Sequence, residues 1–185
     1  FGSFSTSQMK QDIADGIFQG WSDPRLPTLS ALFRRGIKPE SLRSFWIELG
    51  LTQKDIAVPL STLYSHNTKC IEPEAPRLAF VRDPVSVNLQ GEYPSLLEIS
   101  AHPETEMPPR TFRINDEVLI EKEDSGKPIR LKDFCDINEN GLVQSINKTD
   151  DRPIVHWIPS GIATTLTIAD GKDIIEIEGM LEEHD

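Results

Sequence analysis

Apolar residues recur at helical spacing in the first third of the chain. The clearest stripe has side chains at i, i+3, i+4 and i+7, namely Leu42, Phe45, Trp46 and Leu49. It predicts an amphipathic helix between Pro39 and Gly50 that buries Phe45 and Trp46. Burial of these aromatic residues also argues against a helix-turn-helix motif that reads DNA, because the second helix of such a motif is exposed.

Capping residues indicate further short helices in the same third. Ser7 and Thr28 are each placed to cap one, and glycines at 16 and 36 are placed to end them. Residues 52–55 resemble a variant capping box, and one more helical face follows Pro59. The first third is therefore expected to be helical.

The pattern changes at residues 72–76, where two prolines in four residues interrupt any helix. Short β-rich runs follow, most of them separated by turn signals such as Asn140-Gly141. The expected strands are residues 78–81, 85–89, 96–100, 112–121, 129–137, 142–147, 154–158, 163–168 and 174–177. Many short strands of this kind predict a β-barrel or sandwich. The chain is thus expected to be an α+β protein of two regions, helical over residues 1–76 and an antiparallel β-barrel over residues 77–185.

Charge is segregated along the chain. The formal net charge of -11 argues against indiscriminate nucleic-acid binding, because phosphate contacts come from lysine and arginine. The first quarter nevertheless holds a basic cluster: Arg25, Arg34, Arg35, Lys38 and Arg43. Residues 176–185 contain five acids and no lysine or arginine. These acids are expected to point away from any face that binds phosphate.

Several classes of protein are excluded by composition. No run of about 18 apolar residues exists to cross a membrane. Two distant cysteines form neither a zinc motif nor a disulfide framework, which fits a reducing cytoplasm. Four scattered histidines give no metal site and no Ser-His-Asp arrangement. A self-contained hydrolase is therefore not supported.

The run Gly-Trp-Ser-Asp-Pro-Arg-Leu at residues 20–26 is distinctive. It resembles the region just after the KMSKS loop of class I glutamyl- and glutaminyl-tRNA synthetases, and residues 3–7 are similar to that loop in a serine-threonine-serine form. Ser3 and Thr6 stand where the family often has lysine. Further blocks appear in the family's order: Tyr64, Asn67, Lys69, Ala75 and Arg77, residues 80–85, His102-Pro103, Arg110, residues 129–133, and residues 155–157. The resemblance covers nearly the whole chain and is closest to archaeal-type glutamyl-tRNA synthetases.

The resemblance implies that the chain is a fragment of a cytoplasmic glutamate-tRNA ligase, from the KMSKS-like loop onward. Residues 1–76 would hold that loop and a tRNA stem-contact region, and residues 77–185 would bind the anticodon. The loop residues Ser5, Thr6 and Ser7 would face ATP, which the whole enzyme uses with magnesium. The implied tRNA-binding residues are Arg25, Arg34, Arg35, Arg110, Arg130 and Lys132.

The partner implied by the resemblance is tRNA, with no DNA, membrane or metal. Because no HIGH-type sequence occurs in these residues, the fragment alone is expected to hold no catalytic residue, to bind no cofactor and to be inactive. Two alternatives remain open. One is the same region of a glutaminyl-tRNA synthetase, and the other is a non-catalytic interaction module derived from it.

Overall fold

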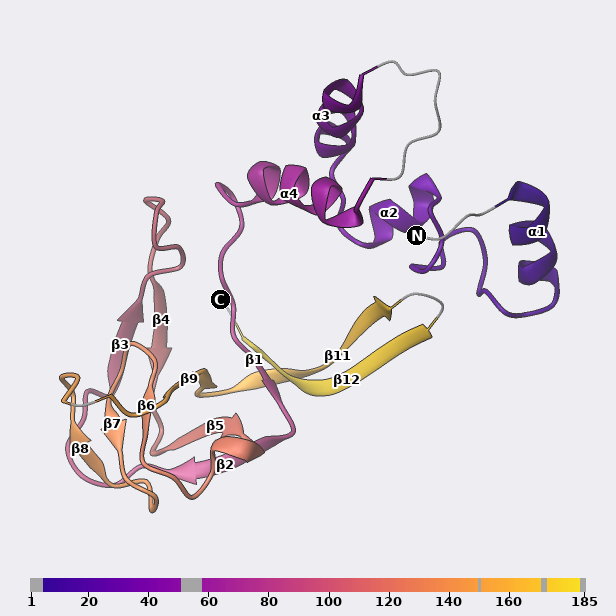
Figure 1. Ribbon diagram of the computed structural model, residues 1–185. Helices are drawn as coiled ribbons and strands as arrows, with labels where there is room; N and C mark the ends of the chain where they lie inside the picture. The colour runs from indigo at the N-terminus through magenta and orange to yellow at the C-terminus, as the bar shows by residue number, and fades with distance from the viewer. Residues whose placement is uncertain (1–4, 51–57, 150, 171–172, 184–185) are drawn as a thin grey trace. The chain divides into compact units, whose positions relative to one another are not determined.

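The computed structural model describes residues 5–50, 58–149, 151–170 and 173–183. The chain divides into two compact units, residues 1–75 with 167–175 and residues 76–166 with 176–185. Helices occupy the first part of the sequence and strands the remainder (Figure 1). The expectation of a mixed helical and antiparallel β protein is therefore confirmed.

The helices of the first unit are α1 (Thr6–Ala14), α2 (Leu29–Arg34), α3 (Pro39–Leu49) and α4 (Leu60–Ile71). Thr28 caps α2 as predicted, since its hydroxyl accepts a hydrogen bond from the Ala31 N–H at 3.1 Å. The prediction that Ser7 caps α1 is wrong. Ser5 does so instead: it has extended backbone angles, and its hydroxyl accepts from the Gln8 N–H at 3.1 Å. The capping box predicted at residues 52–55 lies outside the described residues.

Two small apolar clusters support the helices. Met9, Phe18, Leu26 and Ala31 form the first, and Leu32, Ile37 and Leu63 form the second. The buried Asn67 of α4 joins the helices, because its side chain accepts from the Lys38 N–H at 2.8 Å and donates to the Gly36 carbonyl at 3.1 Å. These hydrogen bonds tie α4 to the backbone that leads into α3.

Trp46 differs from the prediction. Its side chain was expected in the core, but the residue is 61% exposed, whereas Phe45 packs against the second cluster. Successive residues of a helix point about 100° apart, so a stripe centred on Phe45 leaves its neighbour at the margin. The Trp46 ring meets the Phe45 ring edge-on, with ring centroids 5.6 Å apart.

Twelve strands are assigned among the described residues. They are β1 (Phe80–Arg82), β2 (Pro84–Asn88), β3 (Leu96–Ile99), β4 (Arg110–Arg113), β5 (Glu117–Glu121), β6 (Ile129–Leu131), β7 (Asp136–Ile137), β8 (Val143–Ser145), β9 (Ile154–Val155), β10 (Trp157–Ile158), β11 (Gly161–Asp170) and β12 (Asp173–Glu182). They form four sheets, in the orders β10-β5-β2, β8-β7-β6-β9, β3-β4 and β1-β12-β11. Antiparallel pairs are formed by β1 with β12, β2 with β5, β5 with β10, β3 with β4, β6 with β7 and β7 with β8, whereas β6 and β9 are parallel.

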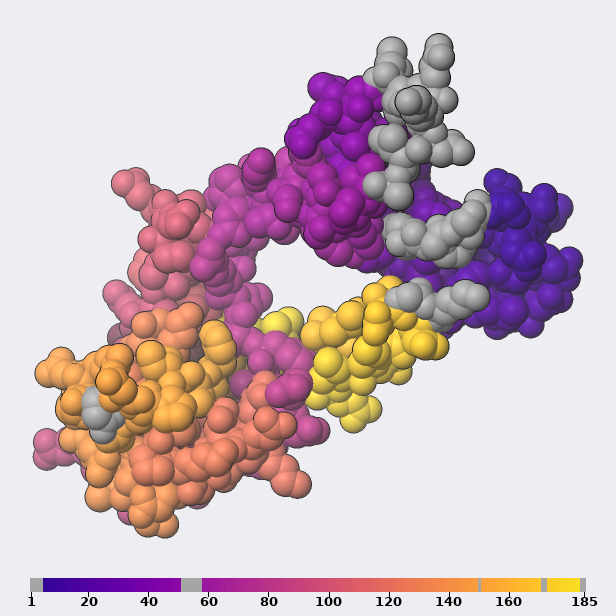
Figure 2. All heavy atoms as spheres, viewed as in Figure 1, coloured from indigo at the N-terminus to yellow at the C-terminus, as the bar shows by residue number. Residues whose placement is uncertain are grey.

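One continuous core fills the β-rich unit. It gathers Leu131, Phe134, Trp157 and other apolar side chains from β2 to β10, segments whose atoms are coloured pink to orange in Figure 2. Aromatic rings contact one another within it, with 5.0 Å between the centroids of Phe134 and Trp157. The strands around this core are mostly two to five residues long.

The predicted barrel is not found among the described strands, because their sheets remain open and separate. Three expected strands are each divided in two, and the one at residues 154–158 becomes β9 and β10, which belong to different sheets. Asp116 separates β4 from β5 with φ 56°, and Asp133 separates β6 from β7 with φ 59°. Positive φ values turn the chain out of an extended path, and aspartate adopts them more readily than most residues.

Candidate nucleic-acid interface

The serine-threonine-serine segment lies at the N-terminus of α1. Ser5, Thr6 and Ser7 are all exposed. The Ser5 hydroxyl is used as the helix cap, while Thr6 and Ser7 lie in the first helical turn. The N–H groups of a first turn have no partner within the helix, so this end of α1 favours anions.

Arg25 is held inside the loop between α1 and α2. Its Nε and Nη2 atoms donate to the two oxygens of Asp23 at 2.9 and 2.7 Å, and Nη2 also donates to the Ile17 carbonyl at 2.8 Å. The guanidinium lies 4.8 Å from the Phe18 ring centroid. Asp23 is fully buried, and the Arg25 side chain is only 14% exposed. This pair fixes the loop that carries the Gly-Trp-Ser-Asp-Pro-Arg-Leu run.

The hydrogen bonds from Arg25 lower the pKa of Asp23 from 3.8 to about 2, against the opposing effect of its burial. A lowered carboxyl pKa stabilises the folded state above pH 4, and that contribution disappears as the pH falls through 2. We therefore expect Asp23→Asn to lower the melting temperature at pH 7, with the gap closing between pH 4 and pH 2. Thermal unfolding followed by circular dichroism measures this; a gap that is constant down to pH 2 would contradict it.

Arg34 and Arg35 lie at the end of α2, beside the same loop. Arg34 is exposed and donates to the Ser22 carbonyl at 3.4 Å. Arg35 donates to the Pro24 carbonyl at 3.4 Å and lies over the Tyr64 ring, 5.4 Å from its centroid. The three arginines predicted in the helical unit therefore gather at one loop, and Arg34 is the most exposed of them.

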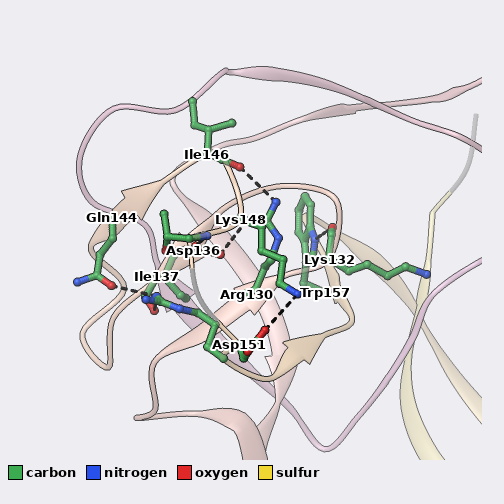
Figure 3. A network of polar contacts seen from close by, with 11 residues as sticks. Arg130, Lys132, Asp136, Ile137, Gln144, Ile146, Lys148, Asp151 and Trp157 are labelled. Atoms are coloured by element: carbon green, nitrogen blue, oxygen red, sulfur yellow. Dashed lines mark hydrogen bonds and ion pairs between the residues drawn. The ribbon is translucent and has the colours of Figure 1, made fainter.

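Arg130 belongs to an internal polar network of the β-rich unit (Figure 3). Its Nη1 atom donates to Asp136 at 2.7 Å, and its Nη2 atom donates to the Ile146 carbonyl at 3.2 Å. Asp136 also accepts from the backbone N–H and the hydroxyl of Thr149, at 3.0 and 2.7 Å. Burial opposes ionisation of Asp136, but these donors outweigh it and hold its pKa below the usual value. The Arg130 side chain is 12% exposed, and that of Asp136 is fully buried.

Arg110 and Lys132 line one cavity of about 630 Å³ in the β-rich unit. The other side chains that bear on its chemistry are Arg77, Asp133, His156, Trp157 and Glu182. Three arginine or lysine residues thus face two carboxylates, so the cavity is locally cationic in an acidic chain. Lys132 is exposed and its side chain extends away from the Arg130 network (Figure 3). Its backbone carbonyl accepts from the Trp157 indole at 2.9 Å, which ties this cation to the aromatic core.

Glu182 contradicts one expectation from the sequence. The acids of residues 176–185 were expected to point away from the basic residues, but Glu182 is buried against Arg110 and forms an ion pair with it. These residues are 72 positions apart, so no local pattern indicated the pairing. His156 was also missed as a candidate. It is exposed at the cavity, directly before the buried Trp157.

Residues 75–152 match the family model described as tRNA synthetases class I (E and Q), anti-codon binding domain. The chain is also 38% identical over 174 residues to the glutamate–tRNA ligase of Methanothrix thermoacetophila, which covers 86% of the chain and 31% of that relative. For the glutamate–tRNA ligase of Archaeoglobus fulgidus, the identity is 34% over 196 residues, with 98% of the chain and 34% of the relative covered.

The chain spans about a third of the length of these curated relatives. Among the described residues, no helix has both the length and the apolar character needed to cross a membrane. The cavity with Arg110 and Lys132 draws its walls partly from the matched segment. Residues 75–152 of this chain therefore match the anticodon-binding domain of class I tRNA synthetases (E and Q), and the chain is similar to archaeal glutamate–tRNA ligases over most of its length.

Proposed function

We infer that this chain is the tRNA-binding part of a glutamate–tRNA ligase, an enzyme that attaches glutamate to tRNA using ATP. The β-rich unit binds the anticodon, and the helical unit contacts the tRNA stem. The observation that carries this proposal is the cationic cavity of about 630 Å³ in a unit that contains an anticodon-binding domain.

The cavity suits a nucleotide that has left its stack. Ligand pockets of roughly 300–1,000 Å³ hold small molecules, and single-stranded RNA is recognised through the edges and faces of splayed bases. Arg110 supplies planar donors, Lys132 supplies a mobile charge for phosphate, and Phe112 and Trp157 supply aromatic walls. Together, the donors and aromatic rings can bind the neutral base, and the lysine charge can bind the anionic backbone.

The helical unit supports two further roles. Exposed Arg34, beside the loop fixed by Arg25 and Asp23, can neutralise a stem phosphate. The N-terminus of α1, with Ser5, Thr6 and Ser7, contacts the ATP that the whole enzyme uses with magnesium. The loop lacks the lysines of its family, so backbone N–H groups carry more of that anion binding here.

Filter binding tests the proposal directly. Transcripts of glutamate and glutamine tRNA, and versions changed at single anticodon positions, are titrated with the 185-residue chain at two salt concentrations. Preferential binding of the glutamate transcript, lost on changing its anticodon, supports the proposal. Equal binding of all transcripts, or none, would refute anticodon recognition, and a preference for the glutamine transcript would favour a glutaminyl-tRNA synthetase.

Lys132→Ala is expected to weaken binding of every transcript and to reduce the slope of log K against log salt by about 0.7, the value for one contact to a single-stranded phosphate. The matched control is Lys122→Ala, which removes an exposed lysine that does not line the cavity. A slope equal to that of the wild type would show that Lys132 does not contact phosphate.

A further inference from the structure

Glu182 is fixed in place at the end of β12. One of its carboxylate oxygens accepts from Arg110 Nη1, and the other accepts from the Ala79 N–H at 3.0 Å. Its own N–H donates to the Ala79 carbonyl at 2.9 Å. The side chains of Arg110 and Glu182 are 10% and 3% exposed. Both carboxylate oxygens are therefore occupied, and the carboxylate can hold Arg110 in one orientation.

Arg110 retains donors that nothing in the described structure uses. A guanidinium carries five N–H groups, yet Glu182 is its one hydrogen-bond partner among the described residues. The Nε atom is buried without any acceptor. Buried donors nearly always have an acceptor, so an unpaired one points to a partner that is absent from the free protein.

The pair lies between two hollows. A second cavity of about 760 Å³ shares Arg110, Phe112, Pro159 and Glu182 with the first. The Arg110 guanidinium is also 5.5 Å from the Phe112 ring centroid, so the aromatic ring and the carboxylate both restrict it. A ligand that enters either cavity meets a guanidinium whose plane is already set.

We propose that Glu182 is a positioning residue for anticodon recognition: it fixes the Arg110 guanidinium so that its remaining N–H groups meet the acceptor edge of one anticodon base. This inference rests on the proposed function. The carbonyl oxygens and ring nitrogens of a base lie in one plane, which matches the planar donors of arginine. A phosphate fits this position less well, because the Glu182 carboxylate offsets the positive charge of Arg110 and repels an anion.

Glu182→Gln tests the role with little change in shape. The change replaces one of the two carboxylate oxygens with an NH2 donor, so the two atoms that now accept from Arg110 and from the Ala79 N–H can no longer both be acceptors. We expect the ratio of affinities for the matched and the single-base-changed transcripts to fall at least about fivefold, the lower range for loss of one base contact. Glu176→Gln, an exposed charge-matched change on β12, is expected to leave the ratio unchanged.

A second variant separates positioning from general structure. In an Arg110→Ala background, Glu182→Gln should leave the affinity ratio unchanged, because the group through which it acts is gone. Equal weakening of all transcripts by Glu182→Gln would mean a purely structural role, and tighter binding of all of them would mean simple charge repulsion. Either result overturns the inference. If the wild-type chain does not distinguish the transcripts, the proposed function fails instead.

Discussion

Asp136→Ala is expected to lower the free energy of unfolding of the β-rich unit by roughly 3–5 kcal/mol, the usual effect of breaking a buried ion pair. Asp136 is fully buried and accepts from Arg130 and from both donors of Thr149. Its loss leaves the Arg130 charge and the Thr149 N–H without their acceptor. Urea unfolding followed by circular dichroism measures the change, with Glu139→Ala, an exposed acid in the next turn, as the control.

The same geometry bears on the hypothesis that Arg130 contacts an anticodon base. With both terminal nitrogens engaged internally, we expect Arg130→Ala to weaken all transcripts equally through loss of stability. Selective loss of the matched transcript, with the unfolding free energy unchanged, would instead support direct base recognition by Arg130.

Trp157→Ala is expected to have an effect of similar size, about 3–5 kcal/mol in the free energy of unfolding, because it empties the largest aromatic site of the core. Trp157 packs between Phe134 and Phe112, with centroid distances of 5.0 and 6.2 Å. Its indole also holds the Lys132 carbonyl at 2.9 Å. Because Trp157→Ala removes this support for Lys132 and the cavity wall, we expect the variant to lose its preference for the matched anticodon. Filter binding would measure that loss.

Trp157→Phe is the matched control. It keeps an aromatic ring but removes the hydrogen bond to Lys132, so its expected effect is about 1 kcal/mol. If the alanine variant were as stable as the phenylalanine variant, the proposed dependence of the cavity on this aromatic core would be wrong.

Local signals predicted much of the helical unit. Thr28 caps α2, and Pro39 begins α3, because a single side chain or ring determines each helix start. The sequence pattern also predicted where the strands lie, but it did not predict the points at which some of them are interrupted. Asp116 and Asp133 adopt positive φ values within runs whose β-branched and apolar residues suggest continuous strands.

The sequence pattern did not predict the contacts between residues that are far apart in the chain. The pairing of Arg110 with Glu182 depends on how β12 returns to β1, which no periodicity encodes. The exposure of Trp46 likewise depends on which side of α3 receives α4. The resemblance to a family identified Arg110 and Lys132, but only the folded chain reveals that they share a cavity and that Arg130 does not line it.

The contact between Ala79 and Glu182 joins residues 103 positions apart. Contacts of such long sequence separation form late and slow folding, because the intervening chain must be ordered first. During synthesis, β1 therefore waits for all the intervening residues before its neighbour β12 leaves the ribosome. A shortened protein that ends at residue 152, where the family match stops, would leave β1 without that neighbour and expose an edge open to aggregation.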